Sequence, residues 1–465
     1  MLTHLRIKNF KAWEDSGSIK LAPLTVMFGT NSAGKSSIGH LLLALKQTVD
    51  SVDRRKALHL GDSNSLIDLG TYEECVHQHD TNKKIGFELA WKQLPDFQDK
   101  EGDLLQINVN FEYVSPQSRV YSLSYIKTPS DEARDIETIN YVRKNDAEFT
   151  LTATGYSPVR THGGSKRKLL EPEKFFHITE KTRACYQNLD FLSDFALETK
   201  EIFDSLYYLG PLRDSPKRIY PWAGDAPEDV GQKGEYTIAA LLAAATKKRI
   251  LHHPYHKYEK QISKDKKTFE FQQLIARWMK QLNLIDEFLV EPIAEGRKEH
   301  EVLIRTNSAG SKVKITDVGF GISQVLPALV QAFYTPRHST VLMEQPEIHL
   351  HPQVQAELAD VFIEAVQIHE KQNPRDVQFI IESHSEHFLT RLQRRVAEGK
   401  IRHEDVAIYF VDNKAGKAVI ESLKLNEYGE IENWPENFFG DEMGDLVART
   451  QAAIKRRQQH QGKDV

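Results

Sequence analysis

The residues best suited to chemistry form an eight-residue run, 29–36, which reads Gly-Thr-Asn-Ser-Ala-Gly-Lys-Ser. Its two glycines let the backbone turn tightly and bring N–H groups close to an anion. Lys35 can reach the outer phosphates of a nucleotide, and the Ser36 hydroxyl can bind Mg²⁺. The run fits the P-loop pattern G-x-x-x-x-G-K-[ST] at every fixed position, so it predicts a site for ATP and Mg²⁺. The residues that we expect to bind the nucleotide here are Asn31, Gly34, Lys35, Ser36 and Ser37.

A second group of polar residues follows the apolar segment 339–343. Glu344 comes first, and Gln345 and Glu347 lie just beyond it. A carboxylate at the carboxyl end of a buried strand can hold Mg²⁺ directly or through water. Another polar side chain just beyond it can polarise the water that attacks a phosphate. The pattern predicts Glu344 as a metal residue, together with Ser36.

A third apolar segment, 377–381, leads into Glu382, Ser383 and His384. The carboxyl ends of parallel strands meet at one edge of a sheet, so His384 is expected beside the P-loop. There a histidine can hydrogen-bond the γ-phosphate and respond to its loss. A single histidine is more often structural, and it is the order of the motifs along the chain that favours the functional interpretation.

Glycine-rich backbone precedes a further apolar segment, 325–333. Gly319, Gly321 and Ser323 lie where a helix is expected to begin. The N–H groups at a helix start can bind an anion. The signal is unspecific by itself, and its meaning comes from its place between the P-loop and Glu344.

These residues need a scaffold that brings distant segments together. Segment 24–28 reads as the strand before the P-loop and 35–49 as the helix after it. From residue 84 onward, alternating segments predict an antiparallel β lobe, followed by a helical segment over 175–206. The predicted strands of the lobe are 85–91, 105–113, 121–126, 139–143 and 148–152. Helices are also predicted over 236–248 and 269–282, strands over 288–293 and 302–306, and a β-hairpin over 406–423.

Length and composition narrow the class of protein. The 465 residues exceed one typical core, so two or more lobes are expected. The net charge of −5 gives no overall attraction to nucleic acid or acidic lipid. The two cysteines, Cys75 and Cys185, lie far apart, which suits a reducing cytosol and argues against a disulfide framework. No signal-like or membrane-spanning segment is visible, so we expect a cytoplasmic protein with no membrane partner.

The order of these motifs resembles that of ABC-type ATPases, in their soluble SMC/RecF/OLD-like branch. Within this branch the chain is most similar to prokaryotic AAA-type ATPases that end in a small domain of unknown function. These in turn resemble ATPase subunits of anti-phage defence systems. The blocks that carry the resemblance are 208–220, 230–235, 317–327, 344–352, 382–387 and 434–439.

The resemblance implies an α/β fold, with a P-loop NTPase head of the ABC type. To this head are added an N-terminal antiparallel β lobe, a mixed and helical insertion, and a small C-terminal α/β extension. We expect the head to be formed by 1–83 and 317–400. The β lobe and helical segment would occupy 84–206, the second insertion 207–316, and the C-terminal domain 401–465.

The resemblance also implies that ATP binds between two copies of the chain. The P-loop of one copy would face Gly319, Gly321 and Ser323 of the other, and His384 would be the switch. A homodimer or higher even oligomer follows, because one chain supplies one P-loop and one signature. In the family the signature serine precedes the glycines, whereas Ser323 follows them here, which leaves the register of its γ-phosphate contact open.

The chain departs from the family again where the catalytic glutamate is expected. The residue after Glu344 is Gln345, and a glutamine can orient a water but cannot take its proton. Either Glu347 acts as the base, or hydrolysis is slow and ATP mainly holds a dimer together. We favour Glu347 as the base. The other catalytic candidates are Gln345, which could act on the water in its place, and His384, the switch.

Together these features favour an ATPase that works as a nucleotide-dependent dimeric switch. Its output would be a separately encoded effector, a nuclease, in prokaryotic anti-phage defence. The alternative is a DNA repair or chromosome-type ATPase that acts directly on DNA. The large insert between P-loop and signature disfavours a transporter subunit. A built-in nuclease is disfavoured because no Asp-x-Asp follows residue 384 to hold two metals.

Overall fold

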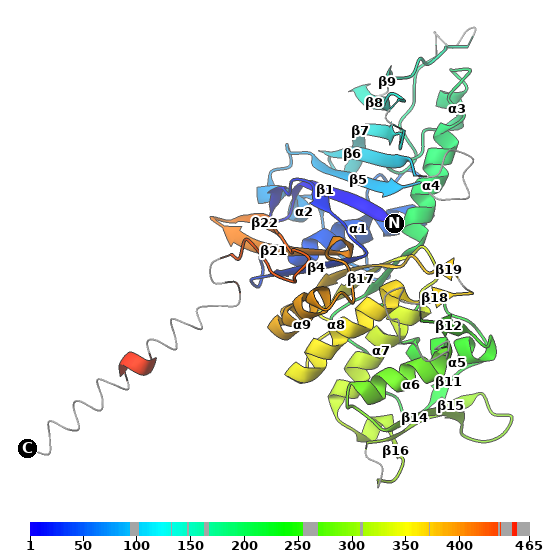
Figure 1. Cartoon of the computed structure of the whole chain (residues 1–465). Helices are drawn as coiled ribbons and strands as arrows, with labels where there is room; N and C mark the ends of the chain where they lie inside the picture. The colour runs from blue at the N-terminus through cyan, green and yellow to red at the C-terminus, as the bar shows by residue number, and fades with distance from the viewer. Residues whose placement is uncertain are drawn as a thin grey trace, which may run out of the picture.

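The structure is a computed structural model of the chain, drawn in Figure 1. It is a mixed α/β fold with a large antiparallel sheet at the top of that view and a mostly parallel sheet in the middle. The predicted α/β class is therefore confirmed. The residues that the structure describes are 1–93, 102–131, 133–146, 148–161, 167–253, 268–306, 310–371, 373–435, 438 and 449–452.

The antiparallel sheet joins the N-terminus to the predicted β lobe. Its eight strands run in the order β2-β1-β5-β6-β7-β8-β9, with β3 beside β1. The N-terminal members are β1 (Leu2–Phe10), β2 (Trp13–Asp15) and β3 (Ile19–Lys20). The five predicted strands are confirmed as β5 (Ile85–Lys92), β6 (Leu104–Val114), β7 (Gln117–Thr128), β8 (Glu137–Asn145) and β9 (Glu148–Thr154).

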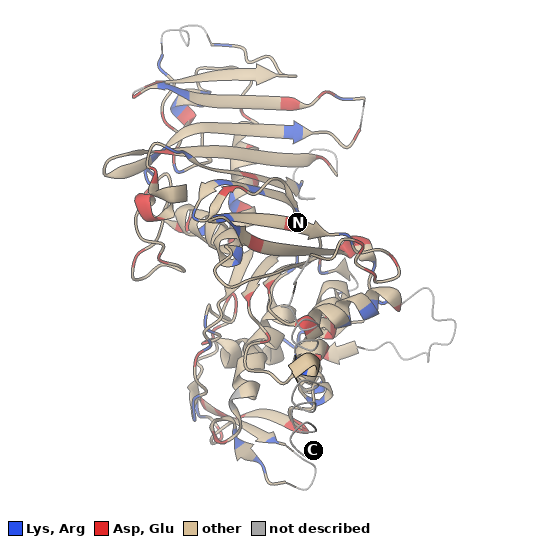
Figure 2. Ribbon diagram, turned by 90° about the vertical axis from the view of Figure 1, so that its left-hand side faces the viewer, with Lys and Arg blue, Asp and Glu red and all other residues tan. Residues whose placement is uncertain are grey.

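Alternation along these strands turns one face of the sheet toward a hydrophobic core. In β6, Leu105 and Ile107 are buried, while Gln106 and Asn108 point to the other face, as the period of two requires. The buried face packs on α1 (Lys35–Asp50) and α4 (Leu192–Asp204), which belong to the same core. Figure 2 shows that the strands are mostly neutral, with isolated charged positions.

The parallel sheet carries the segments that the motifs follow. Its order is β10-β17-β20-β4-β21-β22. The first five strands are parallel, so their carboxyl ends lie at one edge, and β22 turns back antiparallel. The predicted hairpin is confirmed and lies in the same sheet as the P-loop strand. The bounds are β10 (Leu206–Leu209), β17 (Thr340–Glu344), β20 (Gln378–Glu382), β4 (Leu24–Gly29), β21 (Val406–Lys414) and β22 (Lys417–Leu423).

The central strands are apolar at most buried positions because helices cover both faces of this sheet. Leu342 and Ile380 point into the core that contains α1. Their neighbours Met343 and Ile381 point into a second core on the opposite face. The helices of the second core include α7 (Phe320–Tyr334), α8 (Pro352–Gln367) and α9 (Glu386–Ala397).

The lower part of the molecule in Figure 1 supports α7. The predicted helices are confirmed as α5 (Thr237–Thr246) and α6 (Phe271–Gln281), and both pack against α7. The predicted strands are confirmed as β14 (Glu287–Pro292) and β15 (Glu299–Arg305), which form a small sheet with β11 and β16. The remaining short strands are β11 (Tyr220–Pro221), β16 (Val313–Lys314), β12 (Ile250–His252), β13 (Thr268–Glu270), β18 (His369–Glu370) and β19 (Asn373–Pro374).

The prediction of helix throughout 175–206 was wrong for its first half. The structure has only α3 (Glu180–Arg183) before α4, and irregular backbone surrounds it. Lys174 has a φ of 54°, so the chain bends before it reaches Phe175 and Phe176. Both phenylalanines are buried against the antiparallel sheet. Their burial on a flat sheet face outweighs the helical preference of the segment, because tertiary packing routinely overrides propensity.

The C-terminal tail returns to the parallel sheet through one aromatic residue. The Phe438 ring lies 4.7 Å from the Phe410 ring of β21 and 5.8 Å from the Phe28 ring of β4, measured between centroids. Phe438 therefore packs against the P-loop strand and its neighbour. Residues 436, 437 and 439 of the family block 434–439 lie outside the described residues.

The helices of the described residues are of modest length. The longest in the described ranges, α1 and α8, have 16 residues each, whereas a bilayer core takes about 20 apolar residues. Among the described residues, none of the helices combines the length and apolar character needed to cross a membrane.

Candidate nucleotide-binding site

The P-loop turn joins β4 to α1 at the carboxyl edge of the parallel sheet. Gly29 and Gly34 have φ angles of 143° and 103°, which residues with a Cβ rarely adopt. A Cβ on Gly29 would lie 1.9 Å from the carbonyl oxygen of Val411, so β21 leaves no room for one. The Trp13 indole N–H donates to the Gly34 carbonyl oxygen at 3.0 Å. Strands β21 and β2 thus hold the turn from two directions.

Lys35 is the first residue of α1. Its Nζ donates to the carbonyl oxygens of Gly29 and Thr30 at 3.0 and 2.7 Å. Burial lowers the pKa of Lys35, and the negative charge of Glu382 opposes that shift. The first turn of α1 contains no acidic residue. The ammonium group and the helix N-terminus therefore present positive charge together, which suits a phosphate.

The remaining predicted P-loop residues differ in exposure. Asn31 is exposed in the turn, where its amide is accessible to a bound molecule. Ser37 is buried in the first turn of α1. Asn31 is thus open to solvent and Ser37 lies inside the fold, and the binding roles of both stay predictions.

Three oxygen-bearing side chains meet beside the P-loop. Glu344 of β17 and Glu382 of β20 lie directly opposite each other in the strand register. Burial raises the pKa of Glu382, the nearby charge of Glu344 adds to the shift, and a hydrogen bond from Ser36 opposes it. The predicted pair Ser36 and Glu344 is therefore brought to one place, with Glu382 between their elements.

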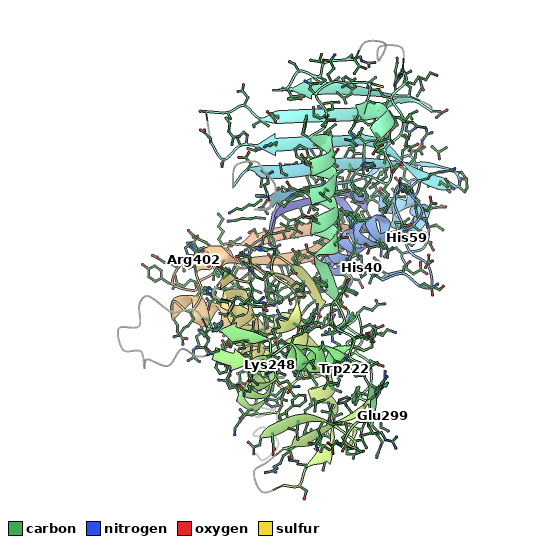
Figure 3. All side chains as sticks on the ribbon, turned by 90° about the vertical axis from the view of Figure 1, so that its right-hand side faces the viewer. His40, His59, Trp222, Lys248, Glu299 and Arg402 are labelled. Carbon is green, nitrogen blue, oxygen red and sulfur yellow. The ribbon has the colours of Figure 1, made fainter. Side chains whose placement is uncertain are left out.

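Side chains from two other elements hold Glu344. The Tyr208 hydroxyl of β10 donates to Oε1 of Glu344 at 2.9 Å, and Nε2 of His40 lies 3.3 Å from the same oxygen. His40 comes from α1 and lies midway between the antiparallel sheet and the lower helices (Figure 3). Glu344 is thus fixed in orientation before any metal arrives, which favours a preorganised metal residue.

Arg213 places a buried positive charge behind the acidic residues. Burial lowers its pKa to about 10, and the charges of Glu344 and Glu347 oppose this shift. Its Nη2 donates to the Glu344 carbonyl oxygen at 3.4 Å. The Nε and Nη1 atoms are buried and have no hydrogen-bond partner among the described residues. A guanidinium in this position offsets part of the negative charge at the carboxyl edge.

Glu347 connects the loop after β17 to the loop after β20. Its side chain is buried, and Oε1 accepts from the Ser383 hydroxyl at 2.8 Å and from the His384 backbone N–H at 2.7 Å. Its Oε2 is buried without a hydrogen-bond partner among the described residues. Burial raises the pKa of Glu347. One oxygen thus anchors the residue, while the other keeps the proton-accepting capacity of a general base.

Gln345 bends the chain between the two glutamates. Its φ is 45°, an uncommon value for a residue other than glycine. Its N–H donates to the Glu382 carbonyl oxygen at 2.8 Å. Left-handed residues of this kind gather at functional sites. The bend fixes the loop after β17 to the end of β20.

His384 lies beside Lys35, as the topology predicted. Burial lowers the pKa of His384, and the positive charge of Lys35 lowers it further. Its Nε2 is 4.0 Å from Oε1 of Glu382. The Ser383 N–H donates to the Met27 carbonyl oxygen of β4 at 3.1 Å, which ties this loop to the P-loop strand. A neutral imidazole next to Lys35 can hydrogen-bond a phosphate oxygen.

The signature residues lie across the sheet from the P-loop helix. Gly319 caps α7, and Gly321 and Ser323 are in its first turn. Helix α7 belongs to the core on one face of the parallel sheet and α1 to the core on the other. A Cβ on Gly319 would have no neighbour within 4 Å. Within one chain the signature residues are therefore apart from Lys35, and the start of α7 is open.

The acidic edge fits a magnesium ion that is shared with a nucleotide. The described residues contain no group of three or more His, Cys, Asp or Glu side chains that could hold a metal alone. Mg²⁺ in nucleotide sites usually takes one or two carboxylates, water and phosphate oxygens. Ser36 and Glu344, with the Oε2 of Glu382 that has no hydrogen-bond partner in the described part of the chain, match that kind of site.

Sequence reasoning missed several residues of this site. His40, Tyr208, Arg213 and Glu382 were given no individual role, although all of them except His40 lie in family blocks. Only Glu382 carried a usable signal, a carboxylate directly after the apolar residues Phe379, Ile380 and Ile381. The other three come from α1 and from the chain around β10, and their meeting with Glu344 depends on contacts 131 to 304 residues apart.

The fold and this site together define a P-loop ATPase. The chain belongs to the AAA ATPase domain family, whose model matches residues 1–205 and 232–389. A second family model, described as a protein of unknown function (DUF3696), matches residues 401–448. The two matches confirm the predicted resemblance to ATPases that end in a small domain of unknown function.

Comparison with solved structures found the SMC head domain from Thermotoga maritima. It shares 12% sequence identity with this chain, covers 91% of this chain and 99% of its own, and has a TM-score of 0.36. A likeness at this level says nothing of activity. Comparison with curated proteins returned no match.

Proposed function

We propose that this ATPase is a nucleotide-driven switch whose site is completed by a second copy of the chain. What carries the proposal is the separation of the two halves of the site. Lys35 and the start of α1 lie on one face of the parallel sheet, and Gly319 caps α7 on the other with open space around it. In a two-fold dimer one patch meets another reciprocally, so two complete sites form at once.

The reaction that we propose is hydrolysis of ATP to ADP and phosphate. Lys35 and the α1 N-terminus bind the phosphates, and Ser36 and Glu344 hold the metal. Bound Mg²⁺ offsets the charge of the phosphate oxygens. Glu347 takes the proton of the attacking water, which Gln345 orients, and His384 contacts the γ-phosphate. The unpartnered Oε2 of Glu347 supports this assignment of the base.

A complementation experiment tests the shared site. Lys35→Ala removes the phosphate contact, and Gly319→Asp puts a negative charge into open space at the start of α7. Each variant alone has two damaged sites per dimer. A mixed dimer has one site with both changes and one intact site. We expect an equal mixture to recover about a quarter of wild-type phosphate release, since half of the dimers are mixed.

Each variant assayed alone at the same total concentration is the matched control. If the mixture stays as inactive as the separate variants while mixed dimers are shown to form, the site does not span two chains. If Gly319→Asp alone keeps wild-type turnover, the signature has no part in it.

We further propose that the output of the switch is a separately encoded effector protein, a nuclease, in prokaryotic anti-phage defence. The sequence blocks that resemble ATPases of such systems support this role. Co-purification with the product of an adjacent gene, dependent on ATP and lost in Lys35→Ala, is the expected result. A salt-sensitive affinity of the isolated protein for DNA would favour the DNA repair or chromosome-type alternative instead.

A further inference from the structure

Two carboxylates face each other at the carboxyl edge of the parallel sheet. Glu344 ends β17 and Glu382 ends β20, and the two residues are partners in the strand register. Their side chains are only 14% and 10% exposed. Like charges directly opposite on neighbouring strands destabilise a sheet, and burial makes the repulsion stronger. The arrangement needs a positive charge that the strands themselves do not provide.

The two carboxylates, Glu344 and Glu382, differ in their contacts with the rest of the protein. Glu344 receives the Tyr208 hydroxyl and lies beside His40. Glu382 lies near Ser36, and its Oε2 is buried without a hydrogen-bond partner among the described residues. The Lys35 ammonium group is directed at the carbonyl oxygens of Gly29 and Thr30. One buried carboxylate oxygen is thus left for a ligand.

We propose that Glu382 supplies a second carboxylate to the magnesium ion, next to Glu344. The proposal rests on the proposed function, because the ion arrives with the nucleotide. Ser36, Glu344 and Glu382 then present oxygens from α1, β17 and β20, three elements that meet at one edge of the sheet. One or two carboxylates with phosphate oxygens are the ligands that Mg²⁺ prefers in such sites.

The position of Glu382 has a second consequence for nucleotide binding. Glu382 is the register partner of Met27 on β4, two residues before the P-loop turn begins at Gly29. Without a metal its negative charge faces the loop that receives the phosphates and opposes their binding. When Mg²⁺ is bound, the ion neutralises this charge, and the Glu382 carboxylate becomes one of its ligands. Glu382 therefore makes nucleotide binding conditional on the metal.

Binding of a fluorescent ATP analogue to the full chain, titrated with Mg²⁺ and repeated in EDTA, tests the proposal. Glu382→Gln keeps the shape and an oxygen acceptor for Ser36 but removes the charge. We expect this variant to need at least tenfold more Mg²⁺ for half-maximal tightening of the analogue. In EDTA it should bind the analogue as tightly as the wild type or more tightly, since a repulsive charge is gone.

Glu386→Gln is the matched control, because Glu386 is exposed in the first turn of α9, four residues further on. It should leave the Mg²⁺ requirement unchanged. Thermal unfolding separates a metal ligand from a merely structural residue. Without metal or nucleotide, Glu382→Gln should melt at or above the wild-type temperature, whereas loss of a structural acceptor would lower it.

The proposal is overturned if Glu382→Gln has the wild-type Mg²⁺ requirement. Should that variant fail to fold, Glu382→Asp decides, because it keeps the charge but shortens the reach: a requirement raised at least threefold supports the proposal, and an unchanged one rejects it. Failure of the proposed function looks different. In that case the wild-type chain itself binds no ATP analogue with or without Mg²⁺.

Discussion

Glu347 joins two parts of the site through a single oxygen. Its Oε1 accepts from Ser383 and from the His384 backbone, and its Oε2 has no partner among the described residues. If Glu347 is the base, as we propose, its anchoring links the attacking water to the loop that carries His384. Gln345, next to Glu344, lacks the ability to accept a proton. The chemical question for single residues is which side chain acts on the attacking water, the Glu347 carboxylate or the Gln345 amide.

Exchange of Glu347 for Gln should stop turnover while preserving the fold. The amide oxygen can still accept from Ser383 and His384, but it cannot take a proton from water. We expect phosphate release to fall about a hundredfold or more, the usual range for loss of a general base. Binding of the ATP analogue should be unchanged.

Gln345→Ala is the comparison for this experiment. The contrary outcome is a large loss of phosphate release in Gln345→Ala together with wild-type turnover in Glu347→Gln. It would mean that Gln345 acts on the attacking water and that Glu347 is not the base. Circular dichroism of both variants should match the wild type.

Strand β21 shapes the P-loop from the side opposite β20. The hairpin of β21 and β22 comes from residues beyond 400. Its strand β21 nevertheless pairs with β4 along the whole length of β4. Val411 and Gly29 are partners in this register. The C-terminal hairpin thus sets the space available to the turn that binds the phosphates.

Exchange of Gly29 for Ala should be strongly destabilising. The new Cβ would lie 1.9 Å from the Val411 carbonyl oxygen, and the φ of 143° disfavours a side chain. We expect a loss of about 3 kcal/mol or more in the free energy of unfolding, in the range of severe core changes, together with loss of ATP binding. Urea unfolding measures the first and analogue fluorescence the second.

Gly416→Ala is the matched control in the same hairpin. Gly416 also has a positive φ, 83°, but a Cβ there would meet nothing within 4 Å. Its cost should stay near the ~1 kcal/mol of a left-handed residue. Equal losses for the two variants would mean that the backbone angle, and not β21, limits the turn.

The element α2 (Tyr72–Cys75) should make the fold sensitive to alkaline pH. Burial raises the pKa of the Cys75 thiol to about 11, against a value of 9.0 in an exposed chain. Between these values the unfolded chain loses the proton and the folded chain keeps it, so the stability falls as the pH rises. The loss should reach about 2 kcal/mol.

Urea unfolding of the wild type and of Cys75→Ala at pH 8 and pH 10.5 measures this effect. The wild type should lose more stability than the variant between the two pH values, because other groups titrate equally in both. A parallel loss in the two proteins would show that the thiol does not contribute.

The whole molecule is divided by the parallel sheet into two cores. One contains the antiparallel sheet, α1 and α4, and the other contains α5 to α9. The P-loop helix and the signature helix therefore lie in different cores and cannot combine across the sheet within one chain. In the proposed function, association of two copies would bring both to one nucleotide.

ATP should control the oligomeric state of the chain. With Mg²⁺ and ATP, Glu347→Gln should run at twice the monomer mass, because it binds the nucleotide but does not hydrolyse it. Light scattering after size exclusion measures the mass. ATP stabilises the dimer by binding it more tightly than the monomer.

Lys35→Ala under the same conditions should remain at the mass that the protein has without ATP. A Glu347→Gln protein of monomer mass in saturating ATP would contradict the shared site. A dimer of equal amount with and without nucleotide would show that association does not depend on ATP.

The sequence by itself determined the local elements and the order of the motifs. The P-loop, the strands that end at Glu344 and Glu382, and the five strands of the β lobe follow from apolar periodicity and from glycine and hydroxyl types at fixed spacing. The parallel sheet followed from these, because its central strands are apolar on both faces. Each of these signals lies within a few neighbouring residues, so it can be recognised without knowledge of the fold.

Only the tertiary structure decided which of these residues meet. Periodicity says nothing of strand register, so the opposition of Glu344 and Glu382 appeared only when β17 and β20 paired. The anchoring of Glu347 on the His384 backbone joins residues 37 positions apart. The contact of Val411 with Gly29 joins β21 to β4 across most of the chain. Distant contacts are set by packing of complete elements, which no local pattern encodes.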